Sequence, residues 1–332
     1  MSLPKVYVGF SIQEAGIAVL RGNVDFEIWE GNSAPPRDLL LKKLSEADGF
    51  LAWRSKVNGE LLDSAPNLKI VSNYGVGYDS IDVAAASKRG VCVTNTPGVL
   101  TEATADLGFS LILASARRLM EANAYLRSGE WNIWDPELMV GVDVFGATIG
   151  IVGLGQIGQA VARRAKGFGM SVLYSGNNRK PEAEAESGAK YVPLDELLRV
   201  SDFVSLHCPL NDATRGLIGE RELKMMKKTA ILINIARGAV VDQGALFRAC
   251  SEKWILGAGL DVFEREPVPL DEPLLNLRNV TTLPHIGSAS RASRDGMAVC
   301  AASNLVAALQ GRRPQNLVNP EVWRASDAGK GR

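Results

Sequence analysis

The chain has 332 residues, of which 46% are hydrophobic, and its 37 basic and 37 acidic side chains give no net charge. This balance provides no electrostatic footprint for nucleic acid or for an anionic membrane, so we expect neither as a partner. No apolar run approaches the roughly 20 residues that span a bilayer, and the apolar stretch near the N-terminus is too short for a signal peptide, which indicates a cytoplasmic protein.

Apolar runs typical of strands alternate with helical patterns in the first part of the chain, from "KVYVGF" at residues 5–10 to "VCVTNTPG" at residues 91–98. Alternation of this kind indicates βαβ units and a parallel sheet. A helical pattern then runs from residue 102 to about Arg127, with Thr101 placed to cap it and Gly129 to stop it. Because such a helix is long for a globular protein, we expect it to join two bodies or to build an interface.

A second series of strands and helices runs from residue 147 to about residue 287, and its strands are near-continuous apolar runs, as in a parallel sheet covered on both faces. The last helical stretch, residues 293–311, follows the final strand and is expected to pack on the first unit. The sequence therefore predicts an α/β protein with one domain over residues 103–289 and a discontinuous domain over residues 1–102 and 290–332.

A glycine-rich turn opens the second series, where Gly153, Gly155 and Gly158 form a GxGxxG motif between an apolar strand and an amphipathic helix. In this context the glycines allow a tight turn, close approach of backbone to a pyrophosphate, and close packing of helix on strand. The motif predicts a dinucleotide site at the helix N-terminus. The alternative is a glycine-rich turn that binds no ligand.

The next strand ends without the acid that hydrogen-bonds the ribose 2′-hydroxyl of NAD, because Gly176 stands at that point. The residues around it are Ser175, Asn177, Asn178, Arg179 and Lys180. Two amides and two cations suit a 2′-phosphate, so we predict that NADPH is preferred, with NADH also possible. The alternative is a solvated polar turn that accepts either cofactor.

The chain has only two histidines, and His285 is the stronger candidate for a proton carrier, because His207 more plausibly lines the cofactor pocket or packs. Arg237, Glu266 and His285 each lie just past a strand end, and the ends of parallel strands converge on one edge of a sheet. These three side chains suit hydride transfer to a 2-keto acid. The arginine would bind the carboxylate, the histidine would supply a proton, and the glutamate would keep this histidine protonated.

Four cysteines lie inside apolar stretches without the spacing of a metal site or a CxxC motif, namely Cys92, Cys208, Cys250 and Cys300. We expect buried free thiols and no bound metal. The polar tail "ASDAGKGR", residues 325–332, lacks the apolar residues that would anchor it.

The chain resembles the D-isomer-specific 2-hydroxyacid dehydrogenases, and within them the glyoxylate/hydroxypyruvate reductases, from about Lys5 to Val322. The motifs that carry the resemblance are "NYGVGYDSID", "VTNTPGVLTEATADL", "GIVGLGQIGQAVARR", "INIARGAVVD", "GLDVFEREP" and "LPHIGSAS". The resemblance implies two flavodoxin/Rossmann-like domains with parallel sheets, where residues 103–289 bind the nucleotide and the discontinuous domain binds the substrate. It also implies reduction of glyoxylate to glycolate and of hydroxypyruvate to D-glycerate, with His285 as proton donor.

The resemblance assigns further roles by position. Arg237, Glu266 and His285 match the catalytic trio, and the substrate would be held by Val76, Gly77, Arg237 and Ser288. The positions that match or adjoin cofactor contacts, in addition to the turns described above, are Thr104, Gln156, Ile157, Cys208, Pro209, Thr214, Ile235, Asp261, His285 and Gly287. The resemblance also implies a homodimer in which Trp134 enters the partner's active site, although Trp131 and Trp134 could instead pack a loop.

Other functions remain open at this point. A 2-ketogluconate or hydroxyphenylpyruvate reductase has the same fold, because the walls of the pocket set the choice of substrate. A nucleotide-sensing protein related to transcriptional corepressors can also retain the trio. Phosphoglycerate dehydrogenase is disfavoured by the missing acid at Gly176, and formate dehydrogenase carries Gln where this chain has Glu266.

Overall fold

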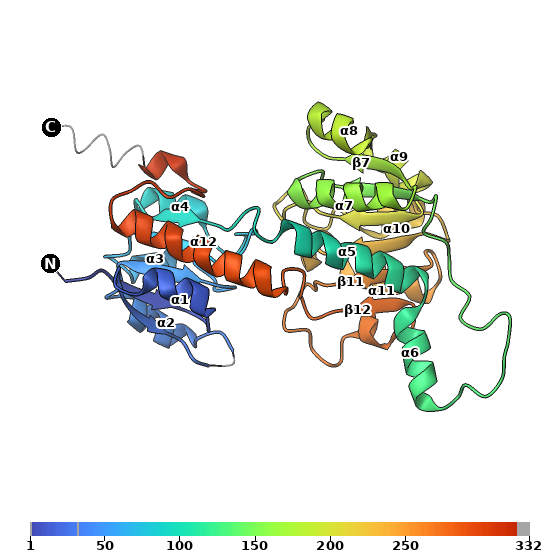
Figure 1. The fold of residues 1–332 in the computed structure, drawn as a ribbon, viewed down its shortest axis with the longest axis horizontal. Helices are drawn as coiled ribbons and strands as arrows, with labels where there is room; N and C mark the ends of the chain where they lie inside the picture. The colour runs from blue at the N-terminus through green and yellow to red at the C-terminus, as the bar shows by residue number, and fades with distance from the viewer. Residues whose placement is uncertain (1, 32, 324–332) are drawn as a thin grey trace. The chain divides into compact units, whose positions relative to one another are not determined.

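Strands and helices alternate along the whole computed structural model, which describes residues 2–31 and 33–323 (Figure 1). The polar tail at residues 325–332 lies outside the described residues. The chain divides into two units, residues 1–100 with 289–332, and residues 101–288. Each unit is built on one parallel sheet, so the predicted α/β class with two flavodoxin/Rossmann-like domains is confirmed.

The first unit holds a five-stranded parallel sheet in the order β2-β1-β3-β4-β5. Its strands are β1 (Lys5–Val8), β2 (Asp25–Ile28), β3 (Gly49–Ala52), β4 (Ile70–Asn73) and β5 (Cys92–Thr94). Its helices are α1 (Glu14–Leu20), α2 (Arg37–Leu44), α3 (Gly59–Asp63), α4 (Val83–Lys88) and α12 (Arg291–Leu309).

Helices cover both faces of this sheet. Leu44 of α2 and Leu61 of α3 pack in one cluster with Phe50 and Val71, which point to the same face of β3 and β4. On the other face, α12 crosses β4, where the Ser72 hydroxyl donates 2.8 Å to the carbonyl of Ala301. The first unit is therefore completed by α12, which lies nearly 200 residues further along the chain than β5.

The second unit holds a seven-stranded parallel sheet in the order β12-β11-β10-β9-β6-β7-β8. Its strands are β6 (Thr148–Val152), β7 (Ser171–Ser175), β8 (Lys190–Tyr191), β9 (Phe203–Leu206), β10 (Ile231–Asn234), β11 (Gly257–Leu260) and β12 (Val280–Thr282). Its helices are α5 (Thr101–Ala116), α6 (Leu119–Ser128), α7 (Gln156–Gly167), α8 (Pro181–Ser187), α9 (Leu194–Val200), α10 (Glu220–Met225) and α11 (Gln243–Ser251), with short 3₁₀ turns at Gly238–Val240 and Pro273–Asn276.

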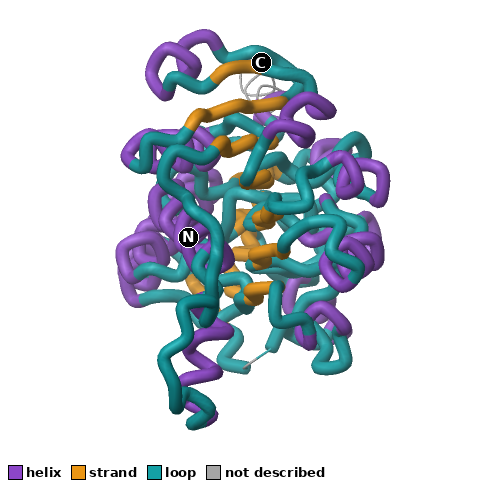
Figure 2. The backbone as a smooth tube through the Cα atoms, turned by 90° about the vertical axis from the view of Figure 1, so that its right-hand side faces the viewer, coloured by secondary structure: helices purple, strands orange, loops and turns teal. Residues whose placement is uncertain are grey.

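Two separate hydrophobic clusters lie on the two faces of the seven-stranded sheet. Ile231 and Ile233 of β10 pack with α5 and α7, whereas Leu232 packs with α9, α10 and α11. This alternation follows the two-residue period of a strand, so a strand between two helical layers is apolar along its whole length. Figure 2 accordingly shows strands in orange flanked by helices in purple.

The helix predicted over residues 102–127 is wrong as a single element, because it breaks into α5 and α6 at Arg118, which adopts a left-handed conformation with φ 50°. The reason is that the N–H of Val142 donates 2.9 Å to the carbonyl of Ala116, an acceptor that a continuous helix would use itself. The Arg118 guanidinium then pairs with Glu121 at 2.8 Å. The helix also begins at Thr101 rather than after it, and Gly129 ends α6 with φ 78° as predicted.

The cysteines are free thiols, and three of them are buried, whereas Cys300 is only partly buried. Burial raises the pKa of the Cys250 thiol to about 12 and that of the Cys92 and Cys208 thiols to about 11, so these three stay protonated and unreactive. Among the described residues there is no cluster of three or more His, Cys, Asp or Glu that could hold a metal ion. No helix in that part of the chain is long and apolar enough to cross a membrane.

Candidate active site

The carboxyl ends of three neighbouring strands bring the predicted trio to one edge of the seven-stranded sheet. Asn234 of β10 pairs with Leu260 of β11, and Leu260 pairs with Thr282 of β12. Arg237, Glu266 and His285 follow these three strands in turn. The parallel register therefore places the loops that carry them side by side.

A short hydrogen bond joins two members of the trio. His285 Nδ1 lies 2.6 Å from Glu266 Oε2, and both side chains are partly buried. The other carboxylate oxygen, Oε1, accepts the N–H of Phe263 at 3.0 Å, which fixes the rotation of the Glu266 side chain. Because Nδ1 is engaged by Glu266, Nε2 is the ring atom that remains for chemistry.

His285 itself has a left-handed backbone with φ 54°, which is uncommon for a residue other than glycine. The loop is held in this conformation by Asp261, whose two carboxylate oxygens accept the N–H groups of Ile286 and Gly287, each at 2.7 Å. Burial raises the pKa of the Asp261 carboxyl, and the two amide donors oppose that shift. Asp261 was predicted as a cofactor contact, and in the structure it braces the loop that presents His285.

The loop that carries Arg237 is packed tightly on the loop after β11. Gly238 has no side chain, and a Cβ there would overlap the backbone of Phe263. Asn234 donates 2.9 Å to the carbonyl of Arg237, and Arg237 Nη1 donates 2.8 Å to the carbonyl of Ala236. These contacts hold the arginine loop directly beside the residues that lead to Glu266.

The glycine-rich turn after β6 has the geometry that a dinucleotide requires. Gly153 has φ 97°, and a Cβ there would lie 2.8 Å from the backbone nitrogen of Cys208. A Cβ at Gly158 would overlap the carbonyl oxygen of Gly153, so this glycine lets α7 pack on the turn. At Gly155 a Cβ would meet no protein atom within 4 Å, and no side chain caps the start of α7. The helix N-terminus is therefore open to a phosphate, and the turn fits a bound nucleotide.

The turn after β7 carries the residues predicted to select the nucleotide. Ser175 is buried, and Asn177, Asn178 and Arg179 are exposed. Arg179 forms a two-point ion pair with Glu184 of α8, with Nη2 to Oε2 at 2.6 Å and Nε to Oε1 at 3.1 Å. The arginine proposed for a 2′-phosphate therefore has a carboxylate partner that sequence reasoning missed.

The other predicted cofactor positions fall into two groups. One group comprises Thr104, Ile235 and Gly287, which lie where α5 meets the loops after β10 and β12. A Cβ at Gly287 would lie 3.4 Å from the methyl group of Thr104, and a Cβ at Gly108 of α5 would lie 2.7 Å from Ile235. The second group follows β9 and comprises Cys208, Pro209 and Thr214, where the Thr214 hydroxyl donates 2.6 Å to the carbonyl of Pro209. Gln156 and Ile157 form the first turn of α7.

His207 precedes Cys208 in the loop after β9, and its Nε2 lies 2.8 Å from the Ser205 hydroxyl oxygen. Burial lowers the pKa of His207 to about 3, so the ring is neutral at physiological pH. A neutral ring is a poor proton donor, so His285 stays the stronger candidate for the proton carrier of the two histidines.

In the first unit, the loop after β4 carries Val76 and Gly77, the predicted substrate contacts. Asn95 donates 2.9 Å to the carbonyl of Val76, and Asn73 donates 2.9 Å to the carbonyl of Gly77. The N–H groups of Val76 and Gly77 donate no hydrogen bond within residues 2–31 and 33–323. The amides thus orient the carbonyls and leave N–H groups for an anion such as a carboxylate.

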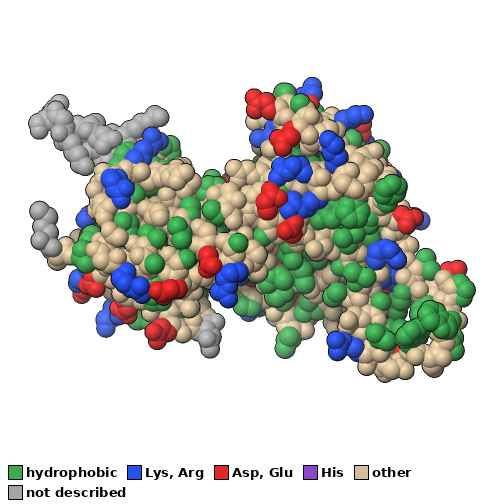
Figure 3. All heavy atoms as spheres, viewed as in Figure 1, with side chains coloured by type: hydrophobic (Ala, Val, Ile, Leu, Met, Phe, Trp, Pro, Cys, Tyr) green, Lys and Arg blue, Asp and Glu red, His purple; other side chains and the backbone are tan. Residues whose placement is uncertain are grey.

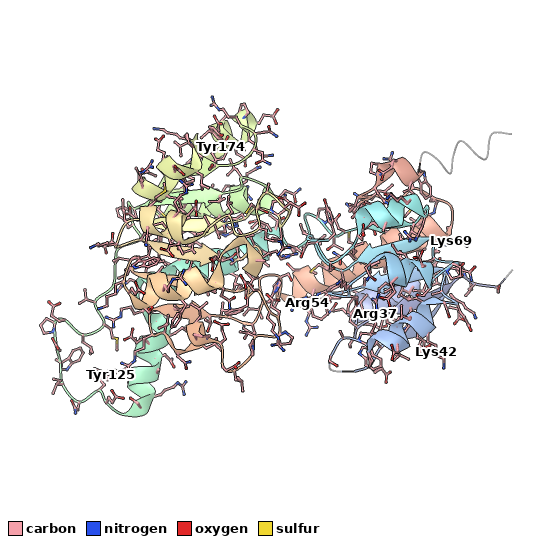
Figure 4. The ribbon with its side chains drawn as sticks, turned by 180° about the vertical axis from the view of Figure 1, so that it is seen from behind. Arg37, Lys42, Arg54, Lys69, Tyr125 and Tyr174 are labelled. Carbon is pink, nitrogen blue, oxygen red and sulfur yellow. The ribbon has the colours of Figure 1, made fainter. Side chains whose placement is uncertain are left out.

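Two arginines that sequence reasoning missed lie near the same edge of this sheet. The guanidinium carbons of Arg54 and Arg294 are 5.4 and 5.5 Å from the ring centroid of Trp53, at cation–π distance. Arg54, labelled in Figure 4, follows β3, the strand beside β4, and has a left-handed backbone with φ 56°. The pair adds positive charge near the loop with unpaired N–H groups.

Trp134 is 88% exposed and lies in the segment after α6, where its ring packs edge-on against Trp131 at 5.3 Å. Figure 3 shows hydrophobic side chains on the surface near α6. The exposed large hydrophobic side chains of α6 and of the segment after it, up to residue 140, are Leu119, Met120, Leu126, Trp131, Ile133, Trp134 and Val140. In the single chain these side chains are exposed to solvent.

Comparison with known proteins gives a consistent result. The family model described as "D-isomer specific 2-hydroxyacid dehydrogenase, NAD binding domain" matches residues 109–287. A glyoxylate reductase from Thermococcus litoralis is 53% identical over 328 residues, which cover 97% of this chain and 99% of that protein. A solved structure from Thermus thermophilus has a TM-score of 0.89 at 44% identity, covering 95% of this chain and 99% of the other. An NADPH-dependent glyoxylate/hydroxypyruvate reductase from Sinorhizobium meliloti, solved with NADP and malonate, has a TM-score of 0.83 at 34% identity, covering 96% and 97%.

Proposed function

Because the chain belongs to the D-isomer-specific 2-hydroxyacid dehydrogenases, we propose that it reduces the 2-keto acids glyoxylate and hydroxypyruvate, with NADPH as the preferred reductant. The relative from Thermococcus litoralis is named a glyoxylate reductase, and the structural neighbour from Sinorhizobium meliloti is named for both substrates and for NADPH. The observation that carries the proposal is the 2.6 Å contact of His285 with Glu266 beside the loop of Arg237. The alternative substrates and the cytoplasmic location stay predictions from the sequence.

The glycine-rich turn and the N-terminus of α7 would hold the pyrophosphate, and the turn after β7 would hold the adenosine ribose. Thr104, Ile235 and Gly287 would line the part of the site next to the trio. When bound, the reduced nicotinamide supplies the hydride that adds to the keto carbon.

The remaining chemistry belongs to the side chains of the trio. His285 donates a proton from Nε2 to the keto oxygen, so that the carbonyl becomes a hydroxyl group. Glu266 lies 2.6 Å from Nδ1 and holds the ring, so that Nε2 remains for this step. Arg237 binds the substrate carboxylate through its planar fork of N–H donors, and the N–H groups of Val76 and Gly77, with the Ser288 hydroxyl, complete the carboxylate site.

A homodimer is part of the proposal, because α6 and the segment after it expose several large hydrophobic side chains, which a partner subunit could cover. In such a dimer, Trp134 would reach the partner's active site. We expect Trp134→Ala to change KM or substrate choice for the keto acids and to leave nucleotide affinity nearly intact. Unaltered kinetics for every keto acid would assign Trp134 to packing alone.

The direct test is oxidation of NADPH and of NADH by the purified protein with glyoxylate, hydroxypyruvate and a panel of larger 2-keto acids. We expect the higher kcat/KM with NADPH, and a loss of roughly tenfold or more, specific to NADPH, in Arg179→Ala. His285→Ala should lose about 10²–10⁴-fold in rate while it still binds nucleotide. Turnover of none of these acids would refute the proposed activity, and a preference for NADH would refute the cofactor assignment.

A further inference from the structure

The turn between β7 and α8 contains a carboxylate that the proposed reaction does not use. We propose that Glu184 is a positioning residue that sets the preference between NADPH and NADH, by holding Arg179 at the 2′-phosphate position while its own charge limits how strongly that phosphate is bound. The inference rests on the proposed role of Arg179 in binding the 2′-phosphate.

Glu184 holds the arginine at two points. Arg179 Nη2 and Nε donate to the two different oxygens of Glu184, at 2.6 and 3.1 Å. The guanidinium plane is therefore fixed, although 64% of the Arg179 side chain is exposed. This pairing leaves the N–H groups of Nη1 for a further anion, since a guanidinium has five N–H donors in a rigid fork.

Glu184 is in turn held by Tyr174, which is buried at the end of β7 and labelled in Figure 4. The Tyr174 hydroxyl donates 2.5 Å to Glu184 Oε1 and accepts the N–H of Lys180 at 2.8 Å. Its ring packs edge-on against Tyr191, whose hydroxyl donates 3.3 Å to the carbonyl of Gly176. The two tyrosine hydroxyls thus form hydrogen bonds to Gly176 and Lys180, at both ends of the turn. The Glu184 side chain is 16% exposed.

The charge of Glu184 is present throughout the working pH range. The hydrogen bonds from Arg179 and Tyr174 lower the pKa of the Glu184 carboxyl to about 2. A 2′-phosphate carries about 1.5–2 negative charges near neutral pH, as phosphate monoesters do. The carboxylate therefore repels the group that the arginine attracts, while a 2′-hydroxyl is nearly indifferent to it.

Two substitutions separate the two effects. Glu184→Gln removes the charge and the acceptor of Arg179 Nη2, but keeps Oε1, the oxygen that accepts from Tyr174 and from Arg179 Nε. Tyr174→Phe keeps the charge and removes the brace. Glu182→Gln is the matched control, because Glu182 is an exposed carboxylate on the same helix with no partner in the described part of the chain.

The experiment measures binding of 2′,5′-ADP and of 5′-AMP to the full-length protein by calorimetry, so that the readout does not depend on turnover. In Glu184→Gln we expect 2′,5′-ADP to bind about twofold to fivefold more tightly, with 5′-AMP unchanged and the gain smaller at high salt. In Tyr174→Phe we expect 2′,5′-ADP to bind about threefold to tenfold more weakly, again with 5′-AMP unchanged. Unchanged 5′-AMP binding also establishes that each variant is folded.

Equal 2′,5′-ADP affinity in Glu184→Gln and Glu182→Gln would overturn the charge effect, and wild-type affinity in Tyr174→Phe would overturn the positioning. Failure of the cofactor proposal has a different signature, namely a wild-type protein that binds 5′-AMP as tightly as 2′,5′-ADP and an Arg179→Ala variant with the same ratio. A wild type that prefers 2′,5′-ADP, together with the same ratio of affinities in Glu182→Gln and Glu184→Gln, would instead overturn the inference alone.

Discussion

The hydrogen bond between His285 and Glu266 determines which ring nitrogen remains for the reaction. Replacing Glu266 with Gln removes a negative charge 2.6 Å from Nδ1 and keeps the shape of the side chain. A neutral hydrogen bond then replaces a charge-assisted one, so the ring is held less firmly and we expect kcat for keto-acid reduction to fall by about tenfold or more. Steady-state kinetics check this, and a wild-type kcat in Glu266→Gln would mean that the carboxylate is not needed to hold the histidine.

Asp261 also affects His285, because it holds the backbone of the loop that presents this histidine. In Asp261→Asn one of the two N–H groups that it accepts loses its partner, because an amide offers one oxygen where the carboxylate offered two. We expect a loss of about 1–3 kcal/mol in the free energy of unfolding, from an unpaired buried donor, and a lower kcat from a displaced His285. Denaturant unfolding and steady-state kinetics test both effects, with exposed Asp271→Asn as the control. Wild-type kcat in Asp261→Asn would show that the loop does not need this brace.

Two glycines at the start of α7 have different roles, because Gly155 leaves room for the nucleotide and Gly158 lets the helix pack on the turn. Gly155→Ala places a methyl group where no protein atom lies within 4 Å, so we expect nucleotide affinity to fall while the free energy of unfolding drops by no more than about 1 kcal/mol. Gly158→Ala places the methyl group against the carbonyl of Gly153 and should cost about 1–3 kcal/mol in stability. Calorimetry with 5′-AMP and thermal melting tell the two apart. Equal melting temperatures would argue that α7 shifts to accommodate both.

Elements with a strong periodic pattern could be predicted from the sequence, and irregular ones could not. The short apolar runs at residues 5–10 and 91–98 predict strands, and β1 and β5 lie there. The pair α8 and β8 was missed, since "PEAEAES" has no apolar stripe and the two residues of β8 are exposed. The break at Arg118 depends on an acceptor taken by Val142, which is distant in sequence, so no local pattern reveals it.

The same distinction holds for the site. Arg237, Glu266 and His285 could be predicted to gather because each follows a strand of one parallel sheet, and the contact between Glu266 and His285 has the expected chemistry. The ion pair of Glu184 with Arg179 depends on how an irregular turn folds back on the next helix. Sequence spacing alone does not indicate which of the acids on α8 the arginine meets.

At the scale of the whole molecule, the apolar surface of α6 predicts association. Leu126 is 57% exposed, and Leu126→Glu would bury a charge in the proposed dimer interface, so we expect this variant to be monomeric where the wild type is dimeric. Sedimentation velocity measures the change, and Leu270→Glu, at a leucine that is 95% exposed and outside this surface, is the matched control. A wild type that sediments as a monomer, or a Leu126→Glu variant that remains dimeric, would contradict the prediction.

The position of α12 in the chain affects how the protein is made. The first unit depends on this helix, which packs closely enough on α1 that a Cβ at Gly16 would lie 2.9 Å from the Cβ of Ala298. During synthesis, residues 101–288 leave the ribosome before α12 does, so the second unit has its complete sequence available while one face of the first sheet still lacks its cover. Of the two units, the one whose synthesis begins earlier is thus the one that finishes folding later, and during that interval the sheet face that α12 covers is exposed to aggregation and to chaperones.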